Sequence, residues 1–253
     1  MTSGPDQDFG HAGMDGVPVV FLSGMLADQR MWEPAIAAYG RVEMVGKPAI
    51  RPVHFDLFDQ DSVAAMARAV LDVAPDRFAL VGMSMGGYVA FEILRQAKAR
   101  VSHLMLVNAR ATADTEAVKR RRVLLARIAG RAQRFVGIND TLLDEMIHPD
   151  NRSNDALIRL LGNMAEQAGA EVFLRQSIAV AHRPDSQGTL ARIDIPSCVM
   201  SGEADQVISP ESHRDMASLI ASADYHEVAG AGHYVPLEQP AIFARALAQL
   251  LRR

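Results

Sequence analysis

The sequence predicts an α/β fold, with a mostly parallel sheet flanked by helices and an all-helical segment inserted between two of its strands. Short apolar, β-branched runs alternate with helical stretches over residues 17–108 and again over 189–253, which is typical of a parallel sheet. Between them, residues 109–188 contain no convincing strand, and their apolar residues recur at spacings of three and four. We therefore expect a core built from the two outer segments and a helical cap built from the inserted one.

The core begins at residues 17–22, an apolar run that indicates a central strand. Residues 1–16, ahead of it, hold four glycines and few apolar residues, so we expect a flexible leader. The same alternation predicts the remaining elements of the core. Strands are expected at 52–55, 78–81, 103–107, 198–201 and 225–228, and helices at 32–39, 63–73, 88–98, 210–220 and 242–251.

Composition limits the classes of function. The net charge of −4 gives no reason to expect nucleic acid or an anionic membrane as a partner. The N-terminal residues lack the basic start and following apolar stretch of a secretory signal. No apolar run approaches the roughly 18–20 residues of a membrane span. We therefore expect a cytoplasmic protein. The single cysteine, Cys198, excludes an internal disulfide framework, and its apolar surroundings predict a buried thiol.

The inserted segment predicts about four helices, with breaks near Gly137, His148-Pro149 and Gly169. Its first helix carries a run of basic residues with few acids nearby. The run consists of Lys119, Arg120, Arg121, Arg122, Arg127, Arg131 and Arg134. There are two interpretations: the run is a solvated face of the helix, or one or more of its arginines bind an anionic part of a substrate. Both interpretations stay open at this point.

The most informative stretch is Gly82-Met83-Ser84-Met85-Gly86-Gly87, which joins an apolar strand to an apolar helix. A serine bracketed by glycines in this setting is typical of a nucleophile elbow, a sharp turn that presents the hydroxyl above the end of the sheet. Glycines at the flanking positions leave room for the backbone. The following helix directs its free N–H groups toward the site. The alternative is an ordinary strand-to-helix turn with a capping serine.

Two polar residues follow later strands in the same way. Asp205 comes shortly after the predicted strand at 198–201, and His233 comes after the last predicted strand. Because parallel strands end at the same edge of a sheet, we expect both side chains to meet Ser84 there. Glu203 and Asp114 are alternative candidates for the acid.

The order Ser, Asp, His, with each residue at a strand end, resembles the α/β-hydrolase family, and the resemblance extends from Val17 to the end of the chain. It implies a triad in which Ser84 attacks, His233 moves the proton and Asp205 orients the imidazole. It also implies an oxyanion hole formed by the backbone N–H groups of Met25 and Met85.

The chain departs from the family pattern in two places. Similar hydrolases usually begin the loop after the first strand with His-Gly, where this chain has Ser23-Gly24. Many relatives also carry a glycine-rich loop after the second strand, which is absent here. The family places its acid at the position of Asp205 rather than at Glu203, and Asp114 would require a rearranged triad.

The resemblance implies a serine hydrolase that cleaves a carboxylic ester of a small or medium substrate through an acyl-enzyme. A thioesterase, a C–C bond hydrolase acting on a diketone-type substrate, and a haloperoxidase-like or acyltransferase enzyme use the same residues and stay open. A non-catalytic ligand-binding protein of this fold is the alternative of another class.

No cofactor or metal motif is present, so none is expected. The expected partner is a small molecule, for which Met25, Met83 and Met85 suit an apolar pocket; the oligomeric state stays open.

Overall fold

A computed structural model describes residues 16–131, 135 and 137–253. The expected leader, apart from Gly16, and Arg134 of the basic run therefore lie outside the described residues. The described chain forms one six-stranded sheet in the order β2-β1-β3-β4-β5-β6, in which every neighbouring pair is parallel. The strands are β1 (Val17–Leu22), β2 (Ile50–Phe55), β3 (Phe78–Met83), β4 (Val101–Val107), β5 (Ser197–Gly202) and β6 (Ala223–Val228).

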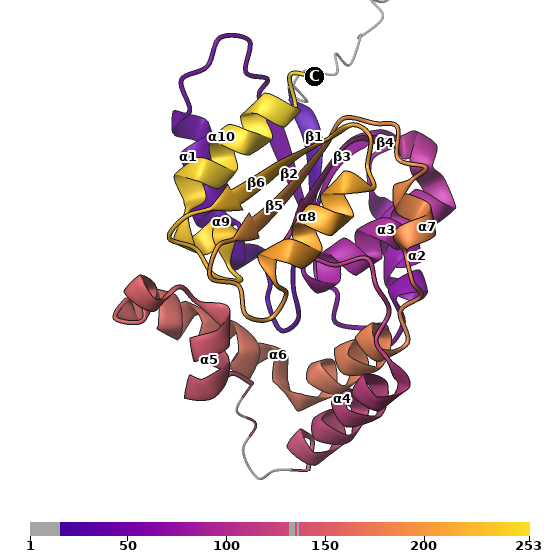
Figure 1. The fold of residues 1–253 in the computed structure, drawn as a ribbon, viewed down its shortest axis with the longest axis vertical. Coiled ribbons are helices and arrows are strands. Elements are labelled where there is room, and N and C mark those ends of the chain that lie inside the picture. Colours follow the sequence, from indigo (N-terminus) through magenta and orange to yellow (C-terminus); the bar gives the residue numbers. More distant parts are fainter. Residues whose placement is uncertain (1–15, 132–134, 136) are drawn as a thin grey trace, which may run out of the picture.

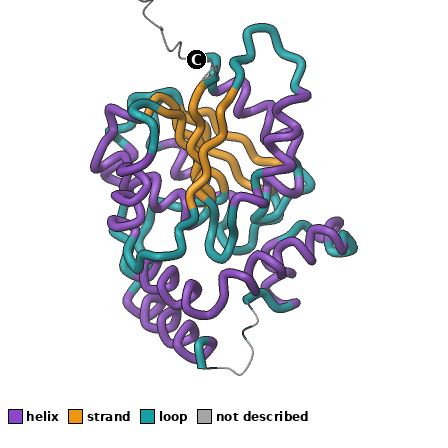
Figure 2. Tube along the Cα trace, turned by 180° about the vertical axis from the view of Figure 1, so that it is seen from behind, coloured by secondary structure: helices purple, strands orange, loops and turns teal. Residues whose placement is uncertain are grey.

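Helices cover both faces of this sheet (Figures 1 and 2). The helices of one face are α1 (Glu33–Arg41), α9 (Val235–Glu238) and α10 (Pro240–Leu250), and those of the other are α2 (Val63–Val73), α3 (Met85–Ala97) and α8 (Pro210–Ser218). The strands alternate between these faces. In β3, Phe78 and Leu80 pack toward α2 and α3, whereas Ala79 and Val81 pack toward the side of α1 and α10. The expected α/β fold is therefore confirmed.

The inserted segment is helical, as predicted, and lies between β4 and β5. Its helices are α4 (Glu116–Ala129), α5 (Asp140–Met146), α6 (Asp155–Ala181) and the short α7 (Gln187–Leu190). Gly169 has a φ of 78° and breaks the helical backbone of α6 at one of the predicted positions. Figure 1 shows α4, α5 and α6 below the carboxyl ends of the strands, so these helices cover the edge of the sheet where the predicted site residues lie.

One buried carboxylate ties the two ends of the insertion together. Asp114 precedes α4 and Arg183 follows α6; the Arg183 Nη2 lies 2.7 Å from the Asp114 Oδ1, and each side chain is 2% exposed. Arg122 donates to the other carboxylate oxygen at 2.9 Å, and Arg110, just after β4, lies 3.5 Å from Oδ1. Burial raises the pKa of the Asp114 carboxyl, but its arginine partners outweigh burial and hold that pKa below its usual value.

Two further observations concern the chain as a whole. Cys198 is buried in β5 as predicted, and burial raises the pKa of its thiol to about 12, which makes it an inert packing residue. In the described ranges, no helix is both long enough and apolar enough to cross a membrane.

Replacing Gly86 by Ala should destabilise the core, because the backbones of β1 and α3 approach each other closely at this residue. A methyl group on Gly86 would overlap the carbonyl oxygen of Leu22, a backbone atom that cannot move without disturbing the sheet. We expect the free energy of unfolding, measured by urea titration, to fall by about 3 kcal/mol or more. Gly162, inside α6, is the matched control, because a methyl group there meets no atom within 4 Å. Its replacement should be neutral or slightly stabilising; equal losses at both positions would contradict the packing described.

Replacing Asp114 by Asn should lower the free energy of unfolding by about 3 kcal/mol at pH 7, because Arg183 stays buried without its counter-charge. The folded-state pKa of Asp114 is depressed, so its stabilising effect is complete above the usual carboxyl pKa and is lost as the pH falls through the folded value. The difference between the variant and the native chain should stay constant from pH 7 to 5 and narrow below about pH 4. Asp72→Asn, at an exposed position of α2, is the control. A difference that does not change with pH would show that the Asp114 charge is not what stabilises the fold.

Candidate active site

Ser84 occupies a strained turn between β3 and α3. Its φ of 51° and ψ of −114° lie where residues with a side chain are rarely found. The turn is held by a hydrogen bond of 2.9 Å from the Ser84 N–H to the carbonyl of Val107, at the end of β4. The Ser84 hydroxyl makes no hydrogen bond to any described residue and faces a cavity.

The backbone strain is concentrated at this edge of the sheet. Among the described residues, the non-glycine positions with positive φ are Leu26 (57°), Ser84 (51°) and Asn108 (47°). They follow β1, β3 and β4, which are neighbours in the sheet. Strained backbone of this kind persists only where the surrounding structure enforces it, and it often accompanies function.

The predicted Asp and His meet in the structure. The Nδ1 of His233 lies 2.9 Å from the Oδ2 of Asp205, and both residues are buried. Burial raises the pKa of the Asp205 carboxyl, but the charge of His233 and several hydrogen bonds outweigh it, so that this pKa lies below its usual value. When the imidazole of His233 carries no charge, the ionised Asp205 keeps the ring proton on Nδ1 and leaves Nε2 as an acceptor.

Three more donors complete the surroundings of the Asp205 carboxylate. Its Oδ1 accepts hydrogen bonds from the backbone N–H groups of Val207 and Ile208 at 2.9 and 3.0 Å. Its Oδ2 accepts from the side-chain amide of Asn108 at 2.8 Å, and the same amide donates to the carbonyl of Gly232 at 3.2 Å. Asn108 was not among the predicted site residues, although it is a polar residue directly after β4, the same strand-end signal that pointed to Asp205 and His233.

The loop after β1 lies against Ser84. A methyl group on Gly24 would lie 3.5 Å from the Cβ of Ser84. Ser23 is buried where similar hydrolases carry His, and it stabilises the turn by accepting a hydrogen bond of 2.9 Å from the Trp32 indole and donating one of 3.2 Å to the carbonyl of Asp28. The altered loop is therefore ordered by a different side chain.

The two N–H groups expected to form an oxyanion hole are both available. Met25 lies in the loop after β1, and Met85 is the first residue of α3, where helical N–H groups have no intrahelical acceptor. Neither N–H has a hydrogen-bond acceptor among the described residues. The N–H of the next residue, Leu26, donates at 2.9 Å to the side chain of Gln176, whose amide donates in turn to the carbonyl of Leu57 at 3.0 Å. Gln176 belongs to α6, so the insertion helps to shape this loop.

The alternative acids are engaged elsewhere. The Glu203 carboxylate accepts a hydrogen bond from the backbone N–H of Gly230 and lies 3.4 Å from the His148 Nε2. Asp114 contacts the arginines described above. Within the described chain, neither carboxylate contacts His233, whereas Asp205 does.

The insertion also holds the loop that carries His233. The backbone N–H of His233 donates to the carbonyl of Met146 at 2.6 Å, and the N–H of Gln206 donates to the carbonyl of Glu145 at 3.3 Å. The approach is so close that a methyl group on Gly232 would lie 2.6 Å from the Met146 oxygen. The end of α5 therefore contacts both the loop that carries the acid and the loop that carries the histidine.

A single carboxylate reinforces this contact. Glu238, in α9, accepts hydrogen bonds from the backbone N–H groups of Gly232 at 2.9 Å and Tyr234 at 3.2 Å, on either side of His233. It also accepts from the N–H of His148 at 2.7 Å and from the Asn151 side chain at 2.9 Å, both in the insertion. Glu238 thus joins the His233 loop to the segment after α5.

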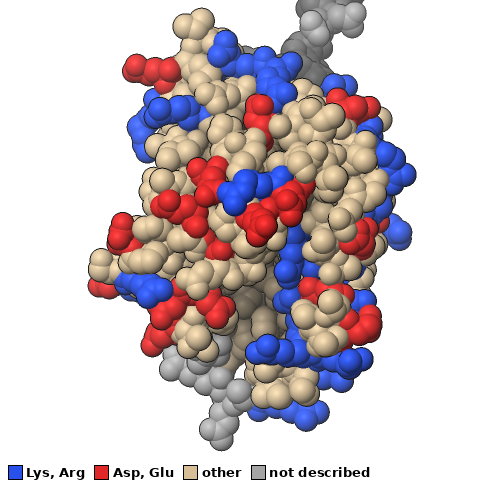
Figure 3. Space-filling model, viewed as in Figure 1, with Lys and Arg blue, Asp and Glu red and all other residues tan. Residues whose placement is uncertain are grey.

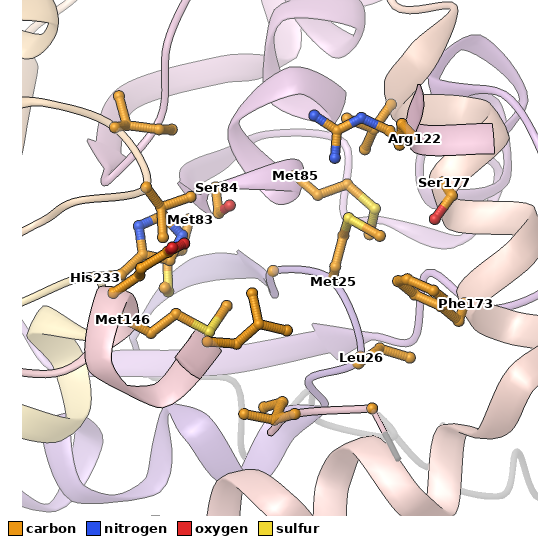
Figure 4. Close-up of a pocket in the computed structure, with 18 of the residues that line it drawn as sticks. Met25, Leu26, Met83, Ser84, Met85, Arg122, Met146, Phe173, Ser177 and His233 are labelled. Carbon is orange, nitrogen blue, oxygen red and sulfur yellow. The ribbon is translucent and has the colours of Figure 1, made fainter. Parts of the chain in front are cut away.

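Ser84 and His233 line one cavity of about 400 Å³ between the core and the insertion (Figure 4). Its walls are largely apolar, and Met25, Met83 and Met85 contribute to them, as expected. Met31 and Trp32, which follow this loop in the sequence, do not line the cavity and are completely buried in the core between the sheet, α1 and α10. The size suits a small or medium organic molecule.

The charges around the cavity are unevenly distributed. Figure 3 shows a hollow between the core and the insertion, with Lys and Arg gathered over α4 and Asp and Glu prominent on the side of α5. Arg121 and Arg122 of the basic run line the cavity, together with Arg110. Arg120 does not, so the run is divided between a solvated face and a cavity wall. Among the described residues, no group of three or more His, Cys, Asp or Glu side chains is placed to hold a metal ion.

Comparison with known proteins agrees with this architecture. The sequence pattern described as the Alpha/beta hydrolase family matches residues 19–246. Curated relatives include the 2-succinyl-6-hydroxy-2,4-cyclohexadiene-1-carboxylate synthase of Escherichia coli O1:K1, which is 27% identical over 253 residues covering 95% of this chain and 96% of that protein.

Solved structures resemble the chain over most of its length. A thermophilic esterase from Thermogutta terrifontis, with malate bound, has a TM-score of 0.83 and 26% identity, covering 94% of this chain and 90% of that one. The enol-lactonase from Burkholderia xenovorans LB400 has a TM-score of 0.78 and 19% identity, covering 95% and 93%, and shows the fold alone. With a family pattern that spans nearly the whole chain and a sheet, helices and insertion arranged as described, this protein belongs to the α/β-hydrolase family.

Proposed function

We propose that this protein is a serine hydrolase that cleaves a carboxylic ester of a small or medium substrate, with Ser84 as nucleophile, His233 as general base and Asp205 as its orienting acid. The proposal rests chiefly on the buried hydrogen bond of 2.9 Å between Asp205 and the His233 Nδ1, at a cavity that Ser84 also lines. Membership in the family supports hydrolysis as the reaction class.

In the first step the ester carbonyl carbon lies against the Ser84 Oγ. The hydroxyl donates to the His233 Nε2, a hydrogen bond that forms as substrate fills the site, and the proton moves to Nε2 as Oγ attacks. Asp205 stabilises the resulting imidazolium through Nδ1. The carbonyl oxygen becomes negative and accepts hydrogen bonds from the N–H groups of Met25 and Met85, each of which lowers the barrier by about 3 kcal/mol.

In the second step the tetrahedral intermediate collapses. The bond to the leaving alcohol breaks, its oxygen takes the proton from the His233 Nε2, and the acyl group stays on Ser84. Water then enters, gives a proton to Nε2 and attacks the acyl carbon. The proton returns to the Ser84 Oγ as the acid product leaves, which restores the starting state.

The orientation of His233 is central to both steps, and Glu238 is placed to control it. Because this carboxylate accepts hydrogen bonds from the backbone N–H groups of Gly232 and Tyr234, it fixes the loop on both sides of the imidazole. Its bond to the His148 N–H ties that loop to the insertion. Loss of Glu238 therefore loosens His233 without altering any group that meets the substrate.

A second candidate is the activity named for the curated relatives, the formation of 2-succinyl-6-hydroxy-2,4-cyclohexadiene-1-carboxylate. The observation that favours it is 27% identity over 95% of this chain. That compound would then compete with ester substrates for the cavity. Inhibition of ester hydrolysis by the compound distinguishes the two, since a plain esterase with an unrelated substrate is not expected to bind it.

Replacing Ser84 by Ala should reduce kcat for 4-nitrophenyl acetate and butyrate at least a thousandfold, because no nucleophile remains. Asp205→Asn should also cost several orders of magnitude, because its amide stabilises the wrong imidazole tautomer. Reaction of the native chain with a serine-directed phosphonate should add one adduct to Ser84 by mass spectrometry. Unchanged turnover in Ser84→Ala would overturn the proposed reaction, and a binding protein would show neither turnover nor adduct.

Replacing Glu238 by Ala should lower kcat for 4-nitrophenyl butyrate about tenfold or more with a smaller change in KM, because the imidazole is misplaced while Glu238 itself does not line the cavity. Glu238→Gln retains one acceptor oxygen and should recover part of the loss. Glu43→Ala, at an exposed position after α1, is the matched control. The measurements belong at a temperature at which circular dichroism shows each variant folded. Equal kcat values for Glu238→Ala and Glu43→Ala would exclude a positioning role.

A further inference from the structure

The end of the cavity formed by α4 and α6 has an excess of positive charge. Three arginines, Arg110, Arg121 and Arg122, line the cavity. Behind them, the Asp114 carboxylate is shared by Arg110, Arg122 and the buried Arg183, so that three positive charges surround one negative charge. The Asp114 carboxylate can balance only one of the three arginines that contact it, and Arg121 adds another positive charge to the cavity lining.

Arg122 presents donors that the protein leaves unused. Its Nε donates to Asp114 at 2.9 Å, which fixes the guanidinium, while its two terminal nitrogens have no hydrogen-bond partner among the described residues. The side chain is 27% exposed, so it is partly withdrawn from solvent. Figure 4 shows the guanidinium directed into the cavity. A guanidinium held in this way offers a pair of parallel donors that match a carboxylate.

Ser177 supplies an independent observation on the neighbouring wall. This residue of α6 is completely buried, lines the same cavity, and its hydroxyl has no hydrogen-bond partner among the described residues. A buried hydroxyl without a partner is costly and requires an explanation, which a bound polar group would provide. In Figure 4, Met25 and Met85 lie between Ser177 and Ser84, so the unpaired hydroxyl is separated from the reacting serine by apolar side chains.

The opposite wall favours one orientation of an anion. Glu145, at the end of α5, also lines the cavity and is bound through its backbone to the loop that carries Asp205. A negative group in the cavity is repelled from that wall and attracted to the wall formed by α4. The cavity thus has a basic end at α4 and a second wall near His233, and apolar methionine side chains lie between the two.

We propose that Arg122, Arg121 and Ser177 form a subsite for a carboxylate, and that the substrate is an ester carrying a carboxylate remote from its scissile bond. This inference rests on the proposed function for the identity of the ester, but the subsite itself does not depend on turnover. Arg122 and Arg121 supply the charge, Ser177 donates its hydroxyl proton to a carboxylate oxygen, and the apolar stretch between them and Ser84 accommodates the connecting chain.

The kinetic test compares paired substrates. Mono-4-nitrophenyl esters of adipic, pimelic and suberic acid carry the carboxylate in the acyl chain, and butyrate esters of hydroxy acids carry it in the alcohol; each is compared with its uncharged counterpart. We expect the native chain to prefer the charged member in at least one series. Arg122→Gln should reduce that preference in kcat/KM by about tenfold to a hundredfold, and Arg121→Gln and Ser177→Ala by about threefold to tenfold.

One further variant, Arg120→Gln, together with Ser177→Ala, makes the test decisive. Arg120→Gln removes the same charge from the adjacent position of α4 but does not line the cavity, so it should leave the preference unchanged. Arg122 also supports Asp114, whereas Ser177→Ala removes a hydroxyl that has no hydrogen-bond partner in the described protein, so its effect reports on the ligand. An unchanged preference in Arg122→Gln and Ser177→Ala, or an equal loss in Arg120→Gln, would overturn the subsite.

Calorimetric titration with adipate and suberate separates this proposal from the proposed reaction. The native chain and Ser84→Ala should bind a dicarboxylate equally well, and Arg122→Gln should weaken binding about tenfold or more. Binding that depends on Arg122 in a protein that hydrolyses no ester would leave the subsite standing and refute the esterase. Ester hydrolysis by a protein that neither binds a dicarboxylate nor prefers a charged substrate would support the esterase and refute the subsite.

Discussion

The site depends on one buried charge, the carboxylate of Asp205, which is stabilised by four hydrogen bonds. A buried carboxylate without partners would be costly, but here both oxygens are satisfied by two backbone N–H groups, the amide of Asn108 and the imidazole of His233. These donors come from the ends of β4, β5 and β6. A charge that holds three strand ends together also fixes the tautomer of the histidine, so the contact that stabilises these loops is the one on which the proposed chemistry depends.

The helical insertion is part of this arrangement rather than a removable cover. Gln176 of α6 connects the loops after β1 and β2. The carbonyl of Met146, at the end of α5, accepts a hydrogen bond from the N–H of His233. Glu238 adds contacts from the core side. The loops at this edge therefore owe their shape to residues on both sides of the cavity, which explains how strained backbone at Leu26 and Asn108 is maintained.

Sequence patterns predicted the bounds of an element well where neighbouring residues alone determine them. The helix at 63–73 has the predicted bounds because Ser62 caps it, accepting the N–H of Ala65 at 3.2 Å. The strand expected at 52–55 is two residues longer, because pairing with β1 extends it over Ile50 and Arg51, which apolar patterning does not mark. The contact between Asp205 and His233, beside a cavity that Ser84 also lines, was predictable from motif and strand order. Gln176 was not identified, because its partner Leu57 lies 119 residues away and no local pattern links such distant groups. The same holds for the contact of Glu238 with His148, 90 residues away. Asn108 was missed although it directly follows a strand, because its partner Gly232 lies 124 residues away.

The hydrogen bond between Trp32 and Ser23 has a spectroscopic consequence. The chain contains one tryptophan, fully buried, whose indole donates to the first residue of the loop that approaches Ser84. Ultraviolet emission excited at the indole band therefore arises from a single fluorophore with one defined hydrogen-bond acceptor. Any rearrangement of that loop alters the polarity around the fluorophore, so the protein carries its own optical reporter of this region without an attached dye.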